Sequence, residues 1–126
     1  MARADKKFKA IRGILSLLST DSTIRSYVED KIYALIAPQD VEGDFIIIRR
    51  DGYRRQDTKM GVSLQASVFY VFVISDDYDR SLDIADKVYD VLDGDHRQHD
   101  FRIRMEDYAE EYIDQKFLQS LKFILE

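Results

Sequence analysis

The sequence contains no cysteine and no tryptophan, and its 126 residues include only one proline, five glycines and two histidines. The absence of cysteine excludes disulfides, thiolate metal sites and a cysteine nucleophile, and it fits folding in a reducing compartment such as the cytoplasm. The low proline and glycine content, together with 45% hydrophobic residues, is not that of a disordered chain. We therefore expect residues 1–126 to form one ordered domain with a single core.

Long apolar segments are missing as well. The apolar residues near the N-terminus are interrupted by Lys9 and Arg12, so the start of the chain lacks the apolar centre of a signal peptide. No run of about 20 apolar residues occurs, so we expect no membrane span. The net charge of −5 argues against a general nucleic-acid binder, because such proteins gain affinity by neutralising phosphates.

Charge is distributed unevenly along the chain. Residues 1–12 carry five bases and one acid, whereas residues 76–95 carry eight aspartates and only two bases, Arg80 and Lys87. One end of the chain is therefore basic, and one predicted helix is acidic.

The N-terminal part of the sequence predicts a helix and a short strand. Apolar residues recur at helical spacing over 8–18, and Asp21 can cap a second short turn after a bend at residues 19–21. Residues 31–33 then predict a short strand that leads to a turn at Pro38, because proline favours an extended residue before it.

Two further segments predict a pair of antiparallel strands. Residues 45–50 are short and β-branched, residues 62–75 alternate over a long run, and the turn signal Asp51-Gly52 follows the first of them. One face of the second strand begins polar and ends apolar, so we expect its later half to be covered by other elements. The residues of that half are Phe69, Val71 and Val73.

The remaining sequence predicts one helix and two strands. The helix begins near Asp79, carries apolar residues at helical spacing as far as Leu92, and has Gly94 as its C-terminal cap. We expect this helix to cover the apolar face of the sheet. Residues 101–106 and 117–125 alternate as two more strands.

These elements indicate an α+β fold in the order α-β-β-β-α-β-β. Long strands joined by short loops favour a two-layer sandwich, with a mainly antiparallel sheet of four to five strands and two helices packed on one face. Tyr108 and Tyr112 are expected to anchor a strand end with buried rings and solvated hydroxyls. The edges of such a sheet are open to pairing with another chain.

The sequence shows no phosphate-binding glycine loop, serine nucleophile elbow or zinc protease motif, and we expect no catalytic residue, cofactor or metal. One alternative is a small metal-dependent hydrolase that uses Asp76, Asp77, Asp79 and His96, because carboxylates are the ligands that Mg²⁺ prefers. In the other interpretation the aspartates cap and solvate the start of a helix, while His96 and His99 lie in a solvated turn.

A set of basic and acidic residues forms the candidate subunit interface. Arginines and one tyrosine flank the predicted Asp51-Gly52 turn, and aspartates line the predicted helix, so the basic loop of one copy can dock on the acidic helix of the next. A solvated hairpin loop and direct nucleic-acid contact are the other interpretations of the arginines. The candidate residues are Arg49, Arg50, Tyr53, Arg54, Arg55, Asp83, Asp86 and Asp90.

The order of these elements and several local segments resemble a known family over nearly the whole chain. The segments are Leu15–Leu18 before a polar turn and Tyr27-Val28, Lys31-Ile32-Tyr33 leading to Ala37-Pro38-Gln39, the strand segments Phe45–Ile48 and Gln65–Ser75, the helix with Ala85, Val88 and Leu92, and the final segment from Glu111-Tyr112 to Phe123. In these features the chain resembles the tail-completion proteins of tailed phages, also called tail-terminator or head-to-tail joining proteins.

The resemblance implies a non-enzymatic structural protein of a phage or prophage. Such a protein typically forms a hexameric ring that caps the finished tail tube and presents a surface to the head connector, while DNA passes through the ring without sequence-specific binding. The expected partners are copies of the same chain, the tail tube and the connector. The expected locations are the host cytoplasm during assembly and the neck of the virion. A monomeric adaptor or regulatory domain, which adds a strand of its partner to a sheet edge, is the alternative.

Overall fold

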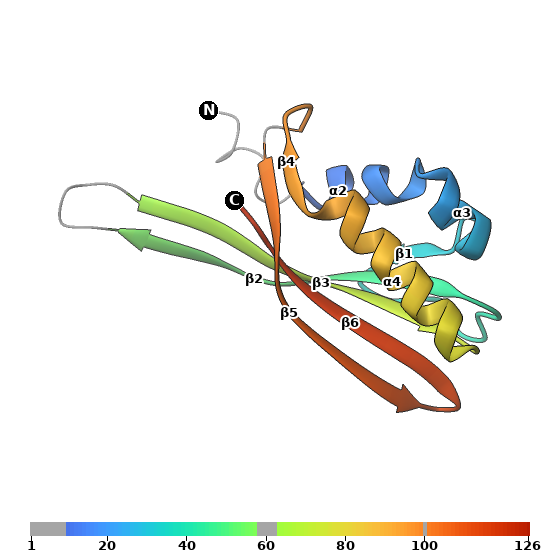
Figure 1. The fold of residues 1–126 in the computed structure, drawn as a ribbon. Helices are drawn as coiled ribbons and strands as arrows, with labels where there is room; N and C mark the ends of the chain where they lie inside the picture. The colour runs from blue at the N-terminus through green and yellow to red at the C-terminus, as the bar shows by residue number, and fades with distance from the viewer. Residues whose placement is uncertain (1–9, 58–62, 100) are drawn as a thin grey trace.

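The computed structural model describes residues 10–57, 63–99 and 101–126, and of residues 52–57 and 63–66 it describes the backbone alone. Figure 1 shows a curled sheet with helices packed against it. In chain order the elements are α2 (Ala10–Ser19), α3 (Ser22–Val28), β1 (Ile32–Ala34), β2 (Phe45–Asp57), β3 (Ser63–Ser75), α4 (Tyr78–Leu92), β4 (Gly94–His96), β5 (Phe101–Ile113) and β6 (Lys116–Leu125).

The sheet has six described strands in the spatial order β1-β2-β3-β6-β5-β4. Neighbours are antiparallel except β1 and β2, which are parallel, so the predicted α+β class and antiparallel character are confirmed in a mixed sheet. The predicted four to five strands are too few. The additional strand is β4, because the polar segment after α4 folds back and pairs with Phe101–Ile103.

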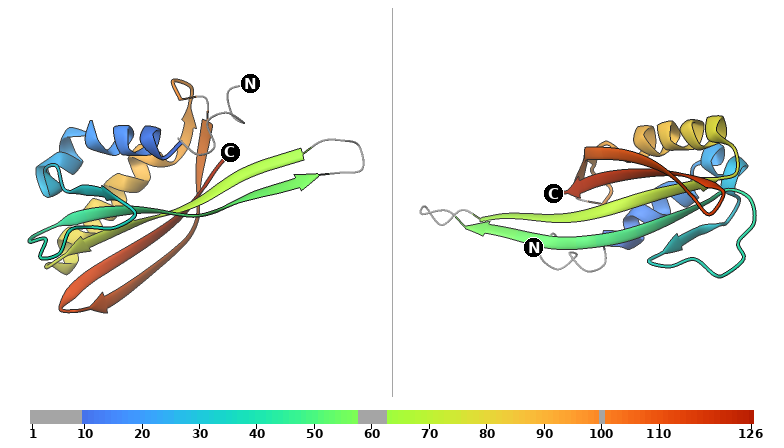
Figure 2. Two further views of the ribbon diagram at one scale, coloured as in Figure 1. Left: turned by 180° about the vertical axis from the view of Figure 1, so that it is seen from behind. Right: turned by 90° about the horizontal axis from the view of Figure 1, so that it is seen from below.

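Three helices, rather than the predicted two, occur in the described residues. The predicted bend near residue 20 separates α2 from α3, and the Asp21 side chain accepts a hydrogen bond from the Ile24 N–H at 3.0 Å. This N-cap satisfies an N–H that the first turn of a helix leaves without an internal partner. Figure 2 shows all three helices on the same side of the sheet, as predicted for the helical layer.

The core lies between this helical layer and the sheet. Phe69, Val71 and Val73 of β3 are buried there, which confirms that the later half of this strand is covered. Buried apolar residues of every helix join one hydrophobic cluster with those of the sheet. They include Ile14, Leu18, Ile24, Val28, Ile84, Val88 and Leu92 from the helices, and Ile46, Ile48, Ile103, Leu121 and Phe123 from the sheet.

The Asp51-Gly52 segment does not form the predicted turn. It lies inside β2, where the register against β3 shifts between Arg50 and Gly52 and leaves Asp51 as the extra residue of a β-bulge. The long alternating partner strand β3 continues the ladder through this position, so long-range pairing overrides the local turn signal. Glycine is compatible with a bulge because it lacks a Cβ atom.

As a result, β2 and β3 extend past the rest of the sheet. Strand β6 pairs with β3 only over Ser67–Ser75, whereas β2 remains paired with β3 as far as the Asp57–Ser63 pair. We call the two-stranded part, Arg54–Asp57 with Ser63–Ala66, the β2–β3 arm. The arm projects away from the helices and the other strands (Figure 1).

The C-terminal half also differs from prediction in two places. Helix α4 ends with Asp93 as its C-cap, and Gly94, at φ +129°, begins β4 instead of capping the helix. Strand β5 continues to Ile113 and forms a hairpin with β6 through Asp114 and Gln115, both at positive φ, as in a two-residue type I′ turn. Within the described ranges, no helix has the length and apolar character needed to cross a membrane.

Candidate assembly surfaces

The predicted basic residues lie along a strand rather than at a loop. Arg49 is exposed on β2 just before the bulge. The side chains of Tyr53, Arg54 and Arg55 lie outside the described part of the chain, but their backbones belong to β2, opposite Ser67, Ala66 and Gln65 respectively. The arginines therefore lead into the β2–β3 arm and do not flank a tight turn.

The predicted acidic helix is α4, and its aspartates form an outward-facing stripe. Asp83, Asp86 and Asp90 are all exposed, and their spacing of three and four residues places them on one face of the helix. The opposite face buries Ile84 and Val88 in the core. The geometry thus leaves these three carboxylates accessible to a partner, as the interface hypothesis requires.

A second group of acidic residues was missed in the sequence prediction. Glu106, Asp107, Glu110 and Glu111 are exposed along β5, in a stretch that was predicted to end the strand early. The segment from Glu106 to Ile113 contains no glycine, proline or asparagine to end a strand, and its two tyrosines favour one; this is the signal that could have revealed a longer, solvent-facing strand. We call the exposed segment Glu106–Ile113 the acidic segment of β5.

A polar network joins the acidic segment to α4 and β6. The Tyr78 hydroxyl donates to Glu110 Oε1 at 3.0 Å, and the Tyr108 hydroxyl donates to Gln119 Oε1. The buried Gln119 amide donates in turn to Ser81 Oγ at 3.1 Å and to Glu110 Oε1 at 3.2 Å. Each buried polar group in this network has a hydrogen-bond partner, so the three elements are held in one arrangement.

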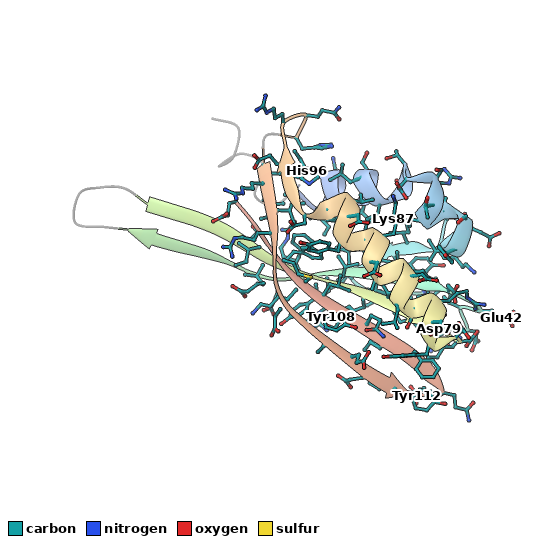
Figure 3. All side chains as sticks on the ribbon, viewed as in Figure 1. Glu42, Asp79, Lys87, His96, Tyr108 and Tyr112 are labelled. Carbon is teal, nitrogen blue, oxygen red and sulfur yellow. The ribbon has the colours of Figure 1, made fainter. Side chains whose placement is uncertain are left out.

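The two acidic groups influence the same tyrosine. The pKa of Tyr108 is raised above its usual value by desolvation and then by the charge of Glu110, with smaller contributions from Tyr78 and Asp86. The hydrogen bond to Glu110 is the main cause of the raised pKa of Tyr78. Asp86 of α4 and Glu110 of β5 therefore contribute to one acidic surface around Tyr108. Figure 3 shows the position of Tyr108 beside β5 and β6.

Tyr108 and Tyr112 do not anchor a strand end with buried rings. Their exposed fractions are 43% and 62%, because β5 continues past both of them and its side chains reach the edge of the helical layer. The ring of Tyr112 packs against Phe117 of β6 with centroids 4.8 Å apart. This exposure makes both tyrosines part of the accessible surface.

The start of α4 is tied to the start of β2 by a buried carboxylate. Asp44, which is 5% exposed, accepts two hydrogen bonds from the Arg80 guanidinium at 2.8 and 3.1 Å and one from Ser75 Oγ at 2.6 Å. This contact raises the pKa of Arg80. Because Ser75 ends β3, the contact fixes α4 against the body of the sheet from which the arm extends.

The face of the sheet opposite the helices carries an apolar groove of about 460 Å³. It lies between the start of β2, the end of β3 and the β5–β6 turn. Its lining includes Pro38, Asp40, Val41, Phe45, Ile47, Phe72, Ile74, Ile113, Asp114, Lys116 and Leu118. No described helix covers this face, so it is a second accessible surface.

The residues of the metal-dependent alternative are not brought together. Asp79 lies at the first turn of α4 and His96 lies beyond its last turn (Figure 3), which separates them by the roughly 22 Å length of a 15-residue helix. Asp77 is the N-cap of α4, as in the capping interpretation, whereas Asp76 forms an ion pair with Lys116 of β6 at 2.9 Å. The described residues contain no group of three potential metal ligands.

The two histidines are held at the N-terminal end of β5. His99 stacks on Phe101, His96 meets the same ring edge-on, and His96 Nε2 lies 2.6 Å from the Leu92 carbonyl oxygen. The segment between them contains a hydrogen-bonded turn from the His99 N–H to the His96 carbonyl, as predicted. Its beginning, however, is strand β4.

Neither a family model nor a curated protein matches the sequence. A solved structure does match the fold: it is a chain in the virion of a native gene transfer agent particle, with a TM-score of 0.73 and 17% sequence identity. The match covers 93% of this chain and 96% of that chain. This chain shares the fold of that virion protein. The likeness therefore extends over the helices, the sheet and nearly the full length of both chains.

Proposed function

We propose that the protein is a structural component of a phage-type virion that assembles through contacts between copies of itself. The observation that carries this proposal is the β2–β3 arm, which extends beyond β6. An isolated two-stranded ribbon is marginally stable in water, so a projecting arm gains stability when it packs on another molecule. The shared fold with a gene transfer agent virion chain supports the same proposal.

The specific role that we propose is tail completion. In this role a closed ring, typically of six copies, caps the tail tube and presents its other face to the head connector. The net charge of −5 suits a ring through which DNA passes, because a net negative surface does not hold phosphate. The proposed role is non-enzymatic and needs no cofactor, and it locates the protein at the virion neck after assembly in the host cytoplasm.

The arginines of β2 are suited to a contact between copies, because the acidic residues lie on a different part of the molecule. Identical copies that meet head to tail need two different, complementary surfaces, and such contacts close into a ring when the rotation permits. The basic part of β2 and the acidic surface on α4 and β5 provide opposite charges on separate parts of one molecule. Complementary charge of this kind favours the correct partner and speeds association.

Light scattering coupled to size-exclusion chromatography tests the proposal, followed by electron microscopy of the assembled fraction. We expect a discrete oligomer with an open centre whose population rises with protein concentration. A protein that stays monomeric at every concentration and ionic strength would contradict assembly and favour the adaptor alternative.

A further inference from the structure

The sheet has two incompletely covered edges, one at each end of its strand order. At one end, β1 pairs only with Ile46–Ile48 of β2. At the other end, β4 pairs only with Phe101–Ile103 of β5. On the outer side of the sheet, no described strand pairs with the remaining parts, Arg49–Asp57 of β2 and Glu106–Ile113 of β5. Each part is longer than a typical strand of five or six residues, so each can accept a full additional strand.

The hydrogen-bonding direction of β5 supports this description of its edge. Ile113 and Lys116 flank the two-residue β5–β6 turn and form a hydrogen-bonded pair. Hydrogen-bonded and non-hydrogen-bonded pairs alternate along an antiparallel ladder, so the N–H and C=O groups of Glu110 and Tyr112 point away from β6. The Tyr108 N–H, at the next outward position, donates to the side chain of Asp107 at 2.8 Å instead of to β6. The outer edge of β5 therefore presents main-chain groups to a partner strand.

The two edges carry opposite charges. The open part of β2 contains four arginines and two aspartates, and the acidic segment of β5 contains four carboxylates and no base. Like charges placed opposite each other on paired strands are destabilising, and charged side chains on edge strands prevent indiscriminate pairing. Two β5 edges therefore repel each other, whereas a β2 edge and a β5 edge attract.

We propose that the acidic segment of β5 receives the open part of β2 from a neighbouring copy by strand addition, which joins the two sheets. The proposal rests on the proposed self-assembly and names its contact. Because the two edges lie at opposite ends of one sheet, each added copy leaves one basic and one acidic edge available. Repetition is head to tail, and it ends only when the ring closes.

Arg49 and Glu111 are suited to a test of this contact, because their side chains lie on the same face of the sheet. Arg49 lies opposite Tyr70, and Glu111 lies opposite Leu118, so both side chains are on the sheet face without helices. Across a joined edge they would lie on the same side of one continuous sheet. Both residues are exposed, so reversing their charges should leave the fold intact.

The experiment compares Arg49→Glu, Glu111→Lys and the variant with both changes by sedimentation and light scattering. We expect each single reversal to raise the dissociation constant roughly tenfold or more, and the double reversal to restore most of the affinity. Asp83→Lys makes the same charge change on α4 and tests whether that part of the acidic surface is the receptor instead. Asp30→Lys, at an exposed residue outside both acidic groups, is the matched control. Urea denaturation of each variant verifies that its fold is retained.

The outcomes separate the contact from the proposed function. If the Glu111→Lys variant assembles as well as the wild-type protein, or if only Asp83→Lys weakens assembly, the β5 edge is not the receptor, while the proposed self-assembly stands. Loss of assembly in both single variants without restoration in the double variant also overturns the pairing. A wild-type protein that is monomeric under all conditions overturns both proposals.

Discussion

At the scale of single residues, the buried carboxylate of Asp44 is the contact whose loss should matter most. It accepts hydrogen bonds from Arg80 and Ser75, and its removal leaves both donors without this acceptor. Asp44 and Ser75 are both buried, so water does not readily replace the lost carboxylate. We expect Asp44→Ala to lower the free energy of unfolding by about 1–3 kcal/mol. The shift in the urea midpoint at unchanged slope measures this effect.

A matched control for Asp44 is the Asp76→Ala variant. Asp76 also forms an ion pair, with Lys116, but its side chain is 53% exposed. Water replaces such a contact readily, so the expected change is within about 0.5 kcal/mol. Equal destabilisation by the two variants would show that the buried position of Asp44 adds nothing to its ion pair.

Tyr78 and Tyr108 predict a stability change at alkaline pH. Their pKa values are raised above 10.0 in the folded state, for Tyr78 chiefly because its hydroxyl donates to Glu110, and for Tyr108 chiefly because of desolvation. Above pH 10 the unfolded chain therefore loses these protons first, so the folded state binds more protons and its stability falls as pH rises. We expect Tyr78→Phe to reduce this loss, measured by urea denaturation across alkaline pH. Tyr89→Phe is the control, and an identical pH profile for both variants would contradict the role of Glu110.

At the scale of elements, the β2–β3 arm should be dispensable for folding and necessary for assembly. Replacing residues 55–65 by Asn-Gly joins Arg54 to Ala66 through a two-residue hairpin turn and leaves all pairing with β6 in place. We expect the free energy of unfolding to stay within about 1 kcal/mol of the wild type, because the deletion lies beyond the last β3–β6 pair, Ser67–Leu125, and removes none of the core residues that the structure describes. The oligomer should be lost in light scattering.

The control for this deletion keeps both strands of the arm and replaces only residues 58–62 with glycine and serine. If the arm makes the contact through its strands, this variant should still assemble. A shortened protein that assembles as well as the wild type would instead assign the contact to another surface, for example the apolar groove that contains Phe72 and Leu118.

At the scale of the whole molecule, the charge arrangement predicts that assembly weakens with salt. The screening length falls from about 10 Å at 0.1 M ionic strength to about 3 Å at 1 M, so contacts between the basic part of β2 and the acidic surface are attenuated. We expect the monomer fraction to increase over that range in sedimentation experiments. Assembly that is unchanged or strengthened by sodium sulfate would indicate an apolar contact.

Much of the local structure could be predicted because it depends on residues that are close in the sequence. Helical spacing of apolar residues predicts α4, and Asp21 is a cap because it lies three residues before the Ile24 N–H. Alternation predicts which face of β3 is buried. The exposed aspartates of α4 follow from the same periodicity. These features need only the geometry of a single element.

The remaining features depend on pairing between distant segments. The Asp51-Gly52 signal becomes a bulge because Val68, sixteen positions after Gly52, continues the ladder. Strand β5 reaches Ile113 because β6 pairs with it from Ile103 to that residue, apart from a bulge at Glu106, and this extension creates the acidic segment that the sequence prediction missed. The sequence by itself therefore determined the helices, the strand faces and the charges. Only the tertiary structure decided the strand order, and with it the placement of opposite charges at opposite edges of one sheet, because strand order is set by long-range hydrogen bonding and burial.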